Sequence, residues 1–161
     1  MPEAKLDHVR SAPVRSVQAR LAQSAAEIAQ CFPVMQHLRS HLVAAEFVGR
    51  IEAQQAQGYR LAYLMDERGD AGAVVAVAGF RVMEMLSTGR TLYVDDLVTD
   101  PAHRSHGHGK AMLDWLQQYA REAGCAAFSL DSGTQRQEAH AFYFRERMRV
   151  TSFHFAKKLT E

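Results

Sequence analysis

The sequence predicts a mixed α/β fold in which two helices precede a group of antiparallel strands and a helical crossover leads to a further, parallel strand. Four segments repeat apolar residues at the spacing of one helical face. Three central strand-like runs are joined by short turns, which implies antiparallel pairing, whereas a helix separates the fourth strand from the fifth and makes those two parallel neighbours. Hydrophobic residues at 47% and charged residues at 23% are the proportions of an ordinary globular protein.

The first strand and the first helix are predicted near the N-terminus. Residues 14–20, "VRSVQAR", alternate apolar and polar side chains as a half-buried strand does. Ser24 is followed three residues later by Glu27, which is the pattern of a helix N-terminus, and the apolar positions of that helix continue to Leu38. Pro33 falls inside this pattern, so we expect it to kink or restart the helix.

The remaining elements follow from apolar period and from turn residues. Short turns, "DERGDAG" and "STGR", separate the central strands, and a glycine follows each of two helical segments as a stop signal. The expected order is β-α-α-β-β-β-α-β-α-β. After the first strand and helix we expect, in turn, a helix at 44–57, strands at 59–65, 73–86 and 91–99, a helix at 109–123, a strand at 125–131, a helix at 136–147 and a strand at 150–159.

Composition excludes several classes of protein. We expect residues 1–12 to form a flexible arm and residues 13–161 a single domain. The net charge of +1 gives no field for a nucleic acid partner, and the longest apolar run, 71–80, is about half the length of a membrane-spanning helix. The N-terminal residues lack the apolar segment of a secretory signal, so we expect a cytoplasmic protein. Cys31 and Cys125 are too far apart for a metal-binding spacing and are expected to be thiols.

The stretch "TDPAHRSHGHGK" at 99–110 is the most informative part of the sequence. His103, His106 and His108 could hold a metal ion only from a loop, and no Cys, Asp or Glu within that loop completes a four-ligand zinc site, so we expect no metal. Gly107 and Gly109 favour the other interpretation. Without a Cβ they let backbone N–H groups point inward, and the following helix adds its positive end, as in a pyrophosphate-binding loop.

The loop also resembles a family. "RSHGHG" at 104–109 matches the R/Q-x-x-G-x-G/A acetyl-coenzyme A loop of the GCN5-related N-acetyltransferases, or GNAT family, and lies between a strand and an amphipathic helix as that family requires. "AHAFYFRERMRVTSFHFAKKL" at 139–159 is similar to the closing helix and strand of the family. Arg147 and Met148 stand where many relatives have Gly-Phe. The resemblance covers residues 91–159, and residues 14–90 agree in element order.

The resemblance implies a GNAT-like single domain whose strands four and five splay apart and leave backbone groups for the pantetheine arm of acetyl-coenzyme A. It also implies that a backbone N–H near Val98 polarises the thioester and that Tyr143 protonates the departing thiolate. The residues expected to bind the cosubstrate are Leu97, Val98, Thr99, Arg104, Ser105, His106, Gly107, His108, Gly109 and Lys110.

Amide formation from a thioester needs a neutral amine, yet an alkyl amine with a pKa near 10.4 is about 99.9% protonated at pH 7. Candidate groups to take that proton are Glu84 on the third strand and Asp95 and Asp96 on the fourth. The last two are adjacent, so they should point to opposite faces of the sheet unless a bulge intervenes. We take Asp96 as the preferred base and Glu84 as the next.

The function predicted from these residues is transfer of an acetyl group from acetyl-coenzyme A to a primary amine, by direct attack in a ternary complex. The acceptor would be a small molecule or a peptide. A non-catalytic module that binds or senses acyl-coenzyme A is the alternative. The sequence leaves the oligomeric state open, a homodimer included.

Overall fold

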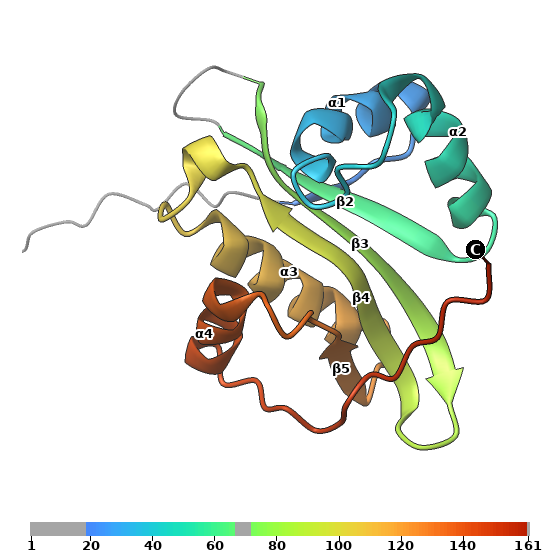
Figure 1. The fold of residues 1–161 in the computed structure, drawn as a ribbon, viewed down its shortest axis with the longest axis vertical. Helices are drawn as coiled ribbons and strands as arrows, with labels where there is room; N and C mark the ends of the chain where they lie inside the picture. The colour runs from blue at the N-terminus through green and yellow to red at the C-terminus, as the bar shows by residue number, and fades with distance from the viewer. Residues whose placement is uncertain (1–18, 67–71, 161) are drawn as a thin grey trace, which may run out of the picture.

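A five-stranded sheet with helices on both faces forms the centre of the computed structural model, which describes residues 19–66 and 72–160 (Figure 1). The elements are, in chain order, β1 (Arg20–Leu21), α1 (Ala25–Met35), α2 (Ala44–Gln55), β2 (Tyr59–Met65), β3 (Val74–Met85), β4 (Gly89–Thr99), a 3₁₀ turn (Pro101–His103), α3 (His108–Glu122), β5 (Ala127–Leu130) and α4 (Gln137–Arg145). In this part of the chain no helix has the length and apolar character needed to cross a membrane.

The strands lie in the order β1-β2-β3-β4-β5. The first four are antiparallel neighbours, whereas β4 and β5 run parallel, from Thr91 opposite Ala127 to Val94 opposite Leu130. This confirms the mixed sheet and the helical crossover expected from the sequence. Beyond Val94, β4 continues to Thr99, and among the described residues it pairs there with β3 alone. The pairing of β4 with β5 therefore ends midway along β4, where β5 itself ends.

A β-bulge interrupts β4 where the two strands part. Gly79 of β3 lies opposite Asp96, but its neighbour Phe80 lies opposite Val94, so Asp95 is one extra residue in β4. An extra residue breaks the strict alternation of side chains between the two faces. This local irregularity sets the positions of both acidic residues of β4.

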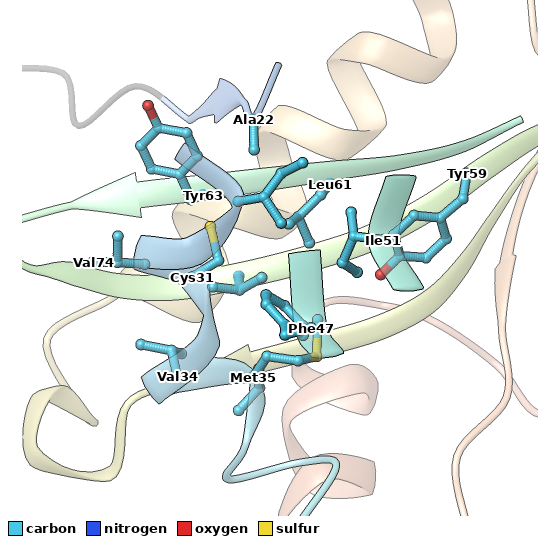
Figure 2. Close-up of a cluster of buried hydrophobic side chains, with 13 residues drawn as sticks. Ala22, Cys31, Val34, Met35, Phe47, Ile51, Tyr59, Leu61, Tyr63 and Val74 are labelled. Carbon is cyan, nitrogen blue, oxygen red and sulfur yellow. The ribbon is translucent and has the colours of Figure 1, made fainter. Parts of the chain in front are cut away.

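Two hydrophobic cores hold the layers together. On one face, α1 and α2 cover the sheet, and Figure 2 shows Met35, Phe47 and Ile51 directed at Leu61 and their other neighbours. On the other face α3 packs its apolar side, which includes Leu116, against strand residues of the second core. α4 lies next to the start of α3, where Lys110 and Glu146 are 3.2 Å apart. The sheet is thus fixed on both sides while the end of β4 stays accessible.

The capping box predicted at the start of α1 is confirmed. The Glu27 amide donates to the Ser24 hydroxyl at 3.2 Å, and the Ser24 amide donates to the Glu27 carboxylate at 2.9 Å. The helix passes through Pro33 without restarting and ends at Met35, so the expected continuation toward Leu38 is replaced by a turn. A proline inside a helix removes one backbone hydrogen bond, and its ring crowds the carbonyl four residues earlier; here the helix ends two residues after Pro33.

Of two other expectations, one is wrong and one falls mostly on residues that the structure does not describe. The sequence predicts a last strand at 150–159, and this prediction is wrong: residues 150–160 have no secondary structure, and the sheet of the described residues ends at β5. The expected arm at 1–12 and most of the expected first strand lie outside the described residues, and β1 begins at Arg20.

Candidate active site

The loop between β4 and α3 presents backbone groups to a cleft. Asp100 starts the 3₁₀ turn, where its carboxylate accepts a hydrogen bond from the Ala102 amide at 3.0 Å. Ser105 and Gly107 both have left-handed backbone conformations, with φ of 64° and 83°. Gly107 is the N-cap of α3, and no side chain caps the amides of its first turn. The loop therefore turns the positive end of a long helix toward the cleft.

This first cleft is lined by all of the residues predicted to bind acetyl-coenzyme A except His106 and is called the cofactor cleft after that prediction. The ring of His106 instead stacks on that of His108, with ring centres 6.1 Å apart. The lining consists of Leu97, Val98, Thr99, Arg104, Ser105, Gly107, His108, Gly109 and Lys110, together with residues 135–139, Phe142, Tyr143, Arg145 and Glu146. Nine of the ten residues predicted to bind acetyl-coenzyme A thus lie on one surface.

Basic side chains stand at this cleft with acidic partners. Lys110 donates to Asp114 at 2.9 Å and to Glu146 at 3.2 Å, and these hydrogen bonds raise the pKa of its ammonium group. Arg104 lies 3.9 Å from Glu138, and both side chains are well exposed. Such exposed pairs are weak and exchange readily for a phosphate.

A second cleft has a volume of about 530 Å³ and is called the acceptor cleft after the amine acceptor that the sequence predicts. It is lined by His37, Leu38, Arg39, Val94, Asp95, Leu97, Leu130, Asp131, Ser132, Gly133, Gln135, Arg136 and Tyr143. Four of these, Leu97, Gln135, Arg136 and Tyr143, also line the cofactor cleft. The two clefts therefore meet where β4 and β5 have separated.

Tyr143 stands at this junction. It projects from α4, is half-buried, and its ring centre lies 5.4 Å from that of Phe142. Burial raises the pKa of the Tyr143 phenol, opposed by the nearby charge of Arg136. The phenol thus remains a proton donor at neutral pH.

Asp96 is held by two partners. Arg39 donates to one carboxylate oxygen at 2.7 Å, and the Tyr59 hydroxyl donates to the other at 2.8 Å. Its side chain is only 12% exposed, and Asp96 is not among the residues lining either cleft. The preferred base of the sequence prediction therefore has both oxygens occupied.

Asp95 lines the acceptor cleft, and Arg81 donates to both of its oxygens, at 3.1 and 3.2 Å. Burial raises the pKa of Asp95, although the hydrogen bond and charge of Arg81 act against that shift. Arg39 bonds the backbone carbonyl of Asp95 as well as the carboxylate of Asp96. The bulge thus brings both acids into one network, where regular alternation would have separated them.

Tyr59 fits into this network because Gly79, which pairs with Leu61 on β2, has no side chain in the space that the Tyr59 ring occupies. A Cβ at position 79 would collide with the phenol ring and hydroxyl of Tyr59. Burial and the negative charge of Asp96 raise the pKa of Tyr59 well above its usual value, so it stays a hydrogen-bond donor. The glycine, the tyrosine and Asp96 together fix the shape of β4 behind the cleft.

Glu84 is not brought to either cleft. It lies near the β3–β4 hairpin, its side chain is 70% exposed, and it pairs with Arg90 at 3.3 Å. Sequence reasoning also left out Asp131, which lines the acceptor cleft and accepts a hydrogen bond from Tyr93 at 2.7 Å. Its position directly after a buried strand is the one signal that could have found it.

The histidines of the loop make local contacts. His103 is 3.2 Å from Asp100, and its ring faces that of His108 at 6.4 Å. Within residues 19–66 and 72–160 no three His, Cys, Asp or Glu side chains are grouped so that they could hold a metal ion.

Comparison with known proteins shows the family. The model of the acetyltransferase (GNAT) family matches residues 23–148. The chain belongs to the GNAT family. A Bacillus subtilis relative described as the uncharacterized N-acetyltransferase YhdJ is 37% identical over 118 residues, which cover 73% of this chain and 80% of the relative.

Two further comparisons place this GNAT acetyltransferase among its relatives. The glucosamine 6-phosphate N-acetyltransferase of Trypanosoma brucei brucei is 32% identical over 110 residues, covering 59% of this chain and 73% of that protein. The solved structure of AAC(6')-Iy with the bisubstrate analog CoA-S-monomethyl-acetylneamine has a TM-score of 0.74 at 13% identity, covering 89% of this chain and 97% of that one. The former supports an N-acetyltransferase, and the latter shows the shared fold.

Proposed function

We propose that this N-acetyltransferase moves the acetyl group of acetyl-coenzyme A to a primary amine of a small molecule, by direct attack in a ternary complex. The observation that carries the proposal is the meeting of two clefts at Leu97 and Tyr143. One cleft has features suited to a pyrophosphate and the other has acidic groups suited to an amine. Both substrates can then be bound at once, with their reacting atoms at the junction.

The cofactor cleft fits the cosubstrate in chemical terms. The uncapped first turn of α3 and the left-handed Gly107 offer backbone N–H groups to a pyrophosphate, and Arg104 and Lys110 add positive charge. The unpaired edge of β4 beyond Val94 offers backbone groups to an extended amide-bearing arm. When bound, acetyl-coenzyme A supplies an activated thioester, and a backbone N–H near Val98 would polarise its oxygen.

Tyr143 would donate the proton that the leaving thiol requires. Its raised pKa keeps the hydroxyl protonated at neutral pH, and its position at the junction places it beside both clefts. A thiol pKa near 8.5 is close enough to that of a phenol for the transfer to be mildly uphill.

Asp95 would accept the proton of the incoming ammonium. Of the two acids on β4 it is the one that lines the acceptor cleft, and its pKa is raised toward the range where a carboxylate is a more effective base. Asp96 would act as a positioning residue, because its bonds to Arg39 and Tyr59 hold the bulge in place. Glu84 has no part in this proposal.

The lining of the acceptor cleft favours a small amine that also carries an acidic group. Asp95 and Asp131 suit the ammonium, whereas Arg39 and Arg136 line the same cleft and suit an anion. A volume of about 530 Å³ matches a small ligand. A relative named for glucosamine 6-phosphate, an amine that bears a phosphate, supports this class.

The deciding experiment compares Tyr143→Phe with Tyr119→Phe. Loss of the Tyr143 hydroxyl should lower turnover with the best amine by about 10²–10⁴-fold, because a general acid is removed. Affinity for acetyl-coenzyme A should change less than threefold, since the proton is needed mainly in the transition state. Tyr119 lies on α3 against Phe80, away from both clefts, and its variant should keep parental turnover.

The measurement is free-thiol release from acetyl-coenzyme A with a panel of amines, together with cofactor affinity by calorimetry. The panel contains amino sugars with and without a phosphate, aminoalkyl phosphonates, amino acids, polyamines and peptides. If Tyr143→Phe retains more than about a third of parental turnover while chemistry limits the rate, solvent supplies the proton. If coenzyme A binds but no amine is acetylated, the chain is a binding module instead.

A further inference from the structure

Arg39 lies in the connection between α1 and α2 and lines the acceptor cleft. Its amide donates to the carbonyl of Met35 at 2.9 Å, and its own carbonyl accepts a hydrogen bond from the Leu42 amide at 3.0 Å. The first of these bonds ties Arg39 to the last residue of α1, and the second closes the turn that leads to α2. The backbone that carries this side chain is therefore held at a defined place beside the cleft.

The guanidinium of Arg39 is held by two oxygens of β4. Its Nε donates to the Asp96 carboxylate at 2.7 Å, and its Nη2 donates to the backbone carbonyl of Asp95 at 3.1 Å. Within residues 19–66 and 72–160 these are the hydrogen bonds that the side chain makes. A guanidinium has five N–H donors, so these two bonds leave three donors for water or for a ligand.

The pair of Arg39 and Asp96 is unequal in exposure. The Asp96 side chain is 12% exposed, whereas that of Arg39 is 45% exposed. The second carboxylate oxygen of Asp96 accepts a hydrogen bond from the Tyr59 hydroxyl at 2.8 Å, which fixes the acid from its other side. A carboxylate buried in this way keeps its charge only with such partners. The buried acid thus orients a cation that is itself accessible from the cleft.

The other basic side chains of the acceptor cleft are less firmly held. Arg136 is exposed, and its side chain forms no ion pair within the part of the chain that the structure describes. His37 lies 4.0 Å from Asp100 and is charged only when its ring is protonated. A cation that is already held loses less side-chain entropy on binding, and a planar guanidinium can donate two parallel hydrogen bonds to one phosphate or carboxylate. Arg39 is therefore the residue of this cleft that is best prepared to bind an oxyanion.

We propose that Arg39 determines the choice of acceptor by binding the phosphate or carboxylate of an amine whose ammonium group lies beside Asp95. This inference rests on the proposed function, because it assigns a role within the same acceptor cleft. The Nη2 atom of Arg39 lies 3.1 Å from the backbone oxygen of Asp95, so the cation and the proposed base are neighbours. One small molecule that carries both charges can reach them together, whereas an amine without an anion leaves the free donors of Arg39 to water.

The first test compares amines in pairs that differ only by the anion: phosphoethanolamine with ethanolamine, glucosamine 6-phosphate with glucosamine, and β-alanine with its amide. The measured quantity is the ratio of kcat/KM for the two members of a pair. The parent should prefer the anionic member of at least one pair, and Arg39→Gln should lower that ratio at least tenfold through lost charge-assisted hydrogen bonds. Arg90→Gln is the matched control, because Arg90 is 49% exposed, pairs with Glu84 and lines neither cleft, so its variant should keep the parental ratio.

Two further variants separate recognition of the acceptor from a purely structural role. Arg39→Lys keeps a positive charge for Asp96 but loses the planar fork, and it should lower the ratio at least threefold. The double variant Arg39→Gln/Asp96→Asn removes the buried charge together with its partner, so the fold holds no unpaired acid, and it should lower the ratio as much as Arg39→Gln. General damage to the fold lowers kcat/KM for both members of a pair and leaves the ratio unchanged. A ratio that stays at the parental value in all three variants would show that Arg39 serves only to neutralise Asp96.

The second test measures binding without acetyl transfer. Calorimetry with the three anionic amines, in the presence of coenzyme A, should show a dissociation constant at least tenfold higher for Arg39→Gln than for the parent. A chain that binds an anionic amine through Arg39 but transfers no acetyl group contradicts the proposed function and leaves this inference standing. Three results would overturn the inference: a parent that favours the anionic member of no pair, equal affinities of parent and Arg39→Gln, or a ratio that falls in Arg136→Gln and not in Arg39→Gln.

Discussion

The two halves of β4 differ in their neighbours. Residues 91–94 pair with strands on both sides, and Leu92 and Val94 lie in the second core. Within the described residues, 95–99 pair with β3 alone and line the clefts through Asp95, Leu97, Val98 and Thr99, although Val98 also packs in the first core. The first half of β4 thus lies inside the sheet, whereas the second half borders the clefts proposed to bind the substrates.

The boundary between the halves is set by two local features. β5 ends at Leu130 because "DSGT", a run of turn-forming residues, follows it. The bulge at Asp95 falls at the same level of the sheet. Because β5 ends early, one edge of β4 is left open to a ligand while the residues of β4 beside it stay packed in the second core.

The largest expected effect is on stability, from Leu92→Ala in the paired half. Leu92 is fully buried, so the truncation should lower the free energy of unfolding by about 2–5 kcal/mol, through lost burial and the cavity left behind. Urea denaturation measures the loss, and calorimetry on the folded variant should show coenzyme A affinity within twofold of the parent. If the affinity for coenzyme A falls together with the free energy of unfolding, the two halves of β4 do not act independently.

Asp95→Asn in the unpaired half should act on turnover, lowering it about 10–100-fold at neutral pH by removing a base. Because burial raises the pKa of Asp95, the parent loses the active carboxylate form as the pH falls through that raised value. The asparagine variant has no such group, so its rate should lack this acidic limb. Rates measured from pH 5 to 9 check the prediction, with Asp96→Asn as the comparison; a limb that disappears in the Asp96 variant instead assigns the base to Asp96.

A smaller effect is expected from Gly107→Ala at the loop that follows the unpaired half. An alanine strains the left-handed conformation of this residue, so coenzyme A affinity should fall about fivefold, or about 1 kcal/mol. Gly124→Ala imposes the same strain at the other end of α3, where φ is 71°, and should lower stability while leaving affinity unchanged. Equal affinities in calorimetry for the two variants would show that the loop does not hold the pyrophosphate.

Local sequence was sufficient to predict the elements whose signals are local. The capping box at Ser24, the periodic helices and the glycine spacing of 104–109 each depend on residues within one or two turns of chain, and the structure has all of them. The cofactor cleft could be anticipated for that reason, since its loop, strand end and helix start are consecutive in the chain.

Features that depend on partners distant in sequence could not be predicted. The contact of Arg39 with both Asp95 and Asp96 accompanies a bulge against β3, and alternation alone places the two side chains on opposite faces. His37, Arg39 and Asp131 come from separate segments that only the folded chain brings to one cleft. The expected strand at 150–159 has the right pattern, but a pattern supplies no pairing partner.

The close fit of Gly79 against Tyr59 has an evolutionary consequence. Positions 59, 79 and 96 are far apart in sequence, yet the phenol of Tyr59 occupies the space that a side chain at 79 would take, and its hydroxyl bonds Asp96. Any larger residue at position 79 displaces the ring of Tyr59, and the carboxylate of Asp96 then loses the hydrogen bond that the Tyr59 hydroxyl donates. Substitutions at these three positions should therefore be inherited together, and a selection from a library randomised at all three should return them as linked sets rather than as independent choices.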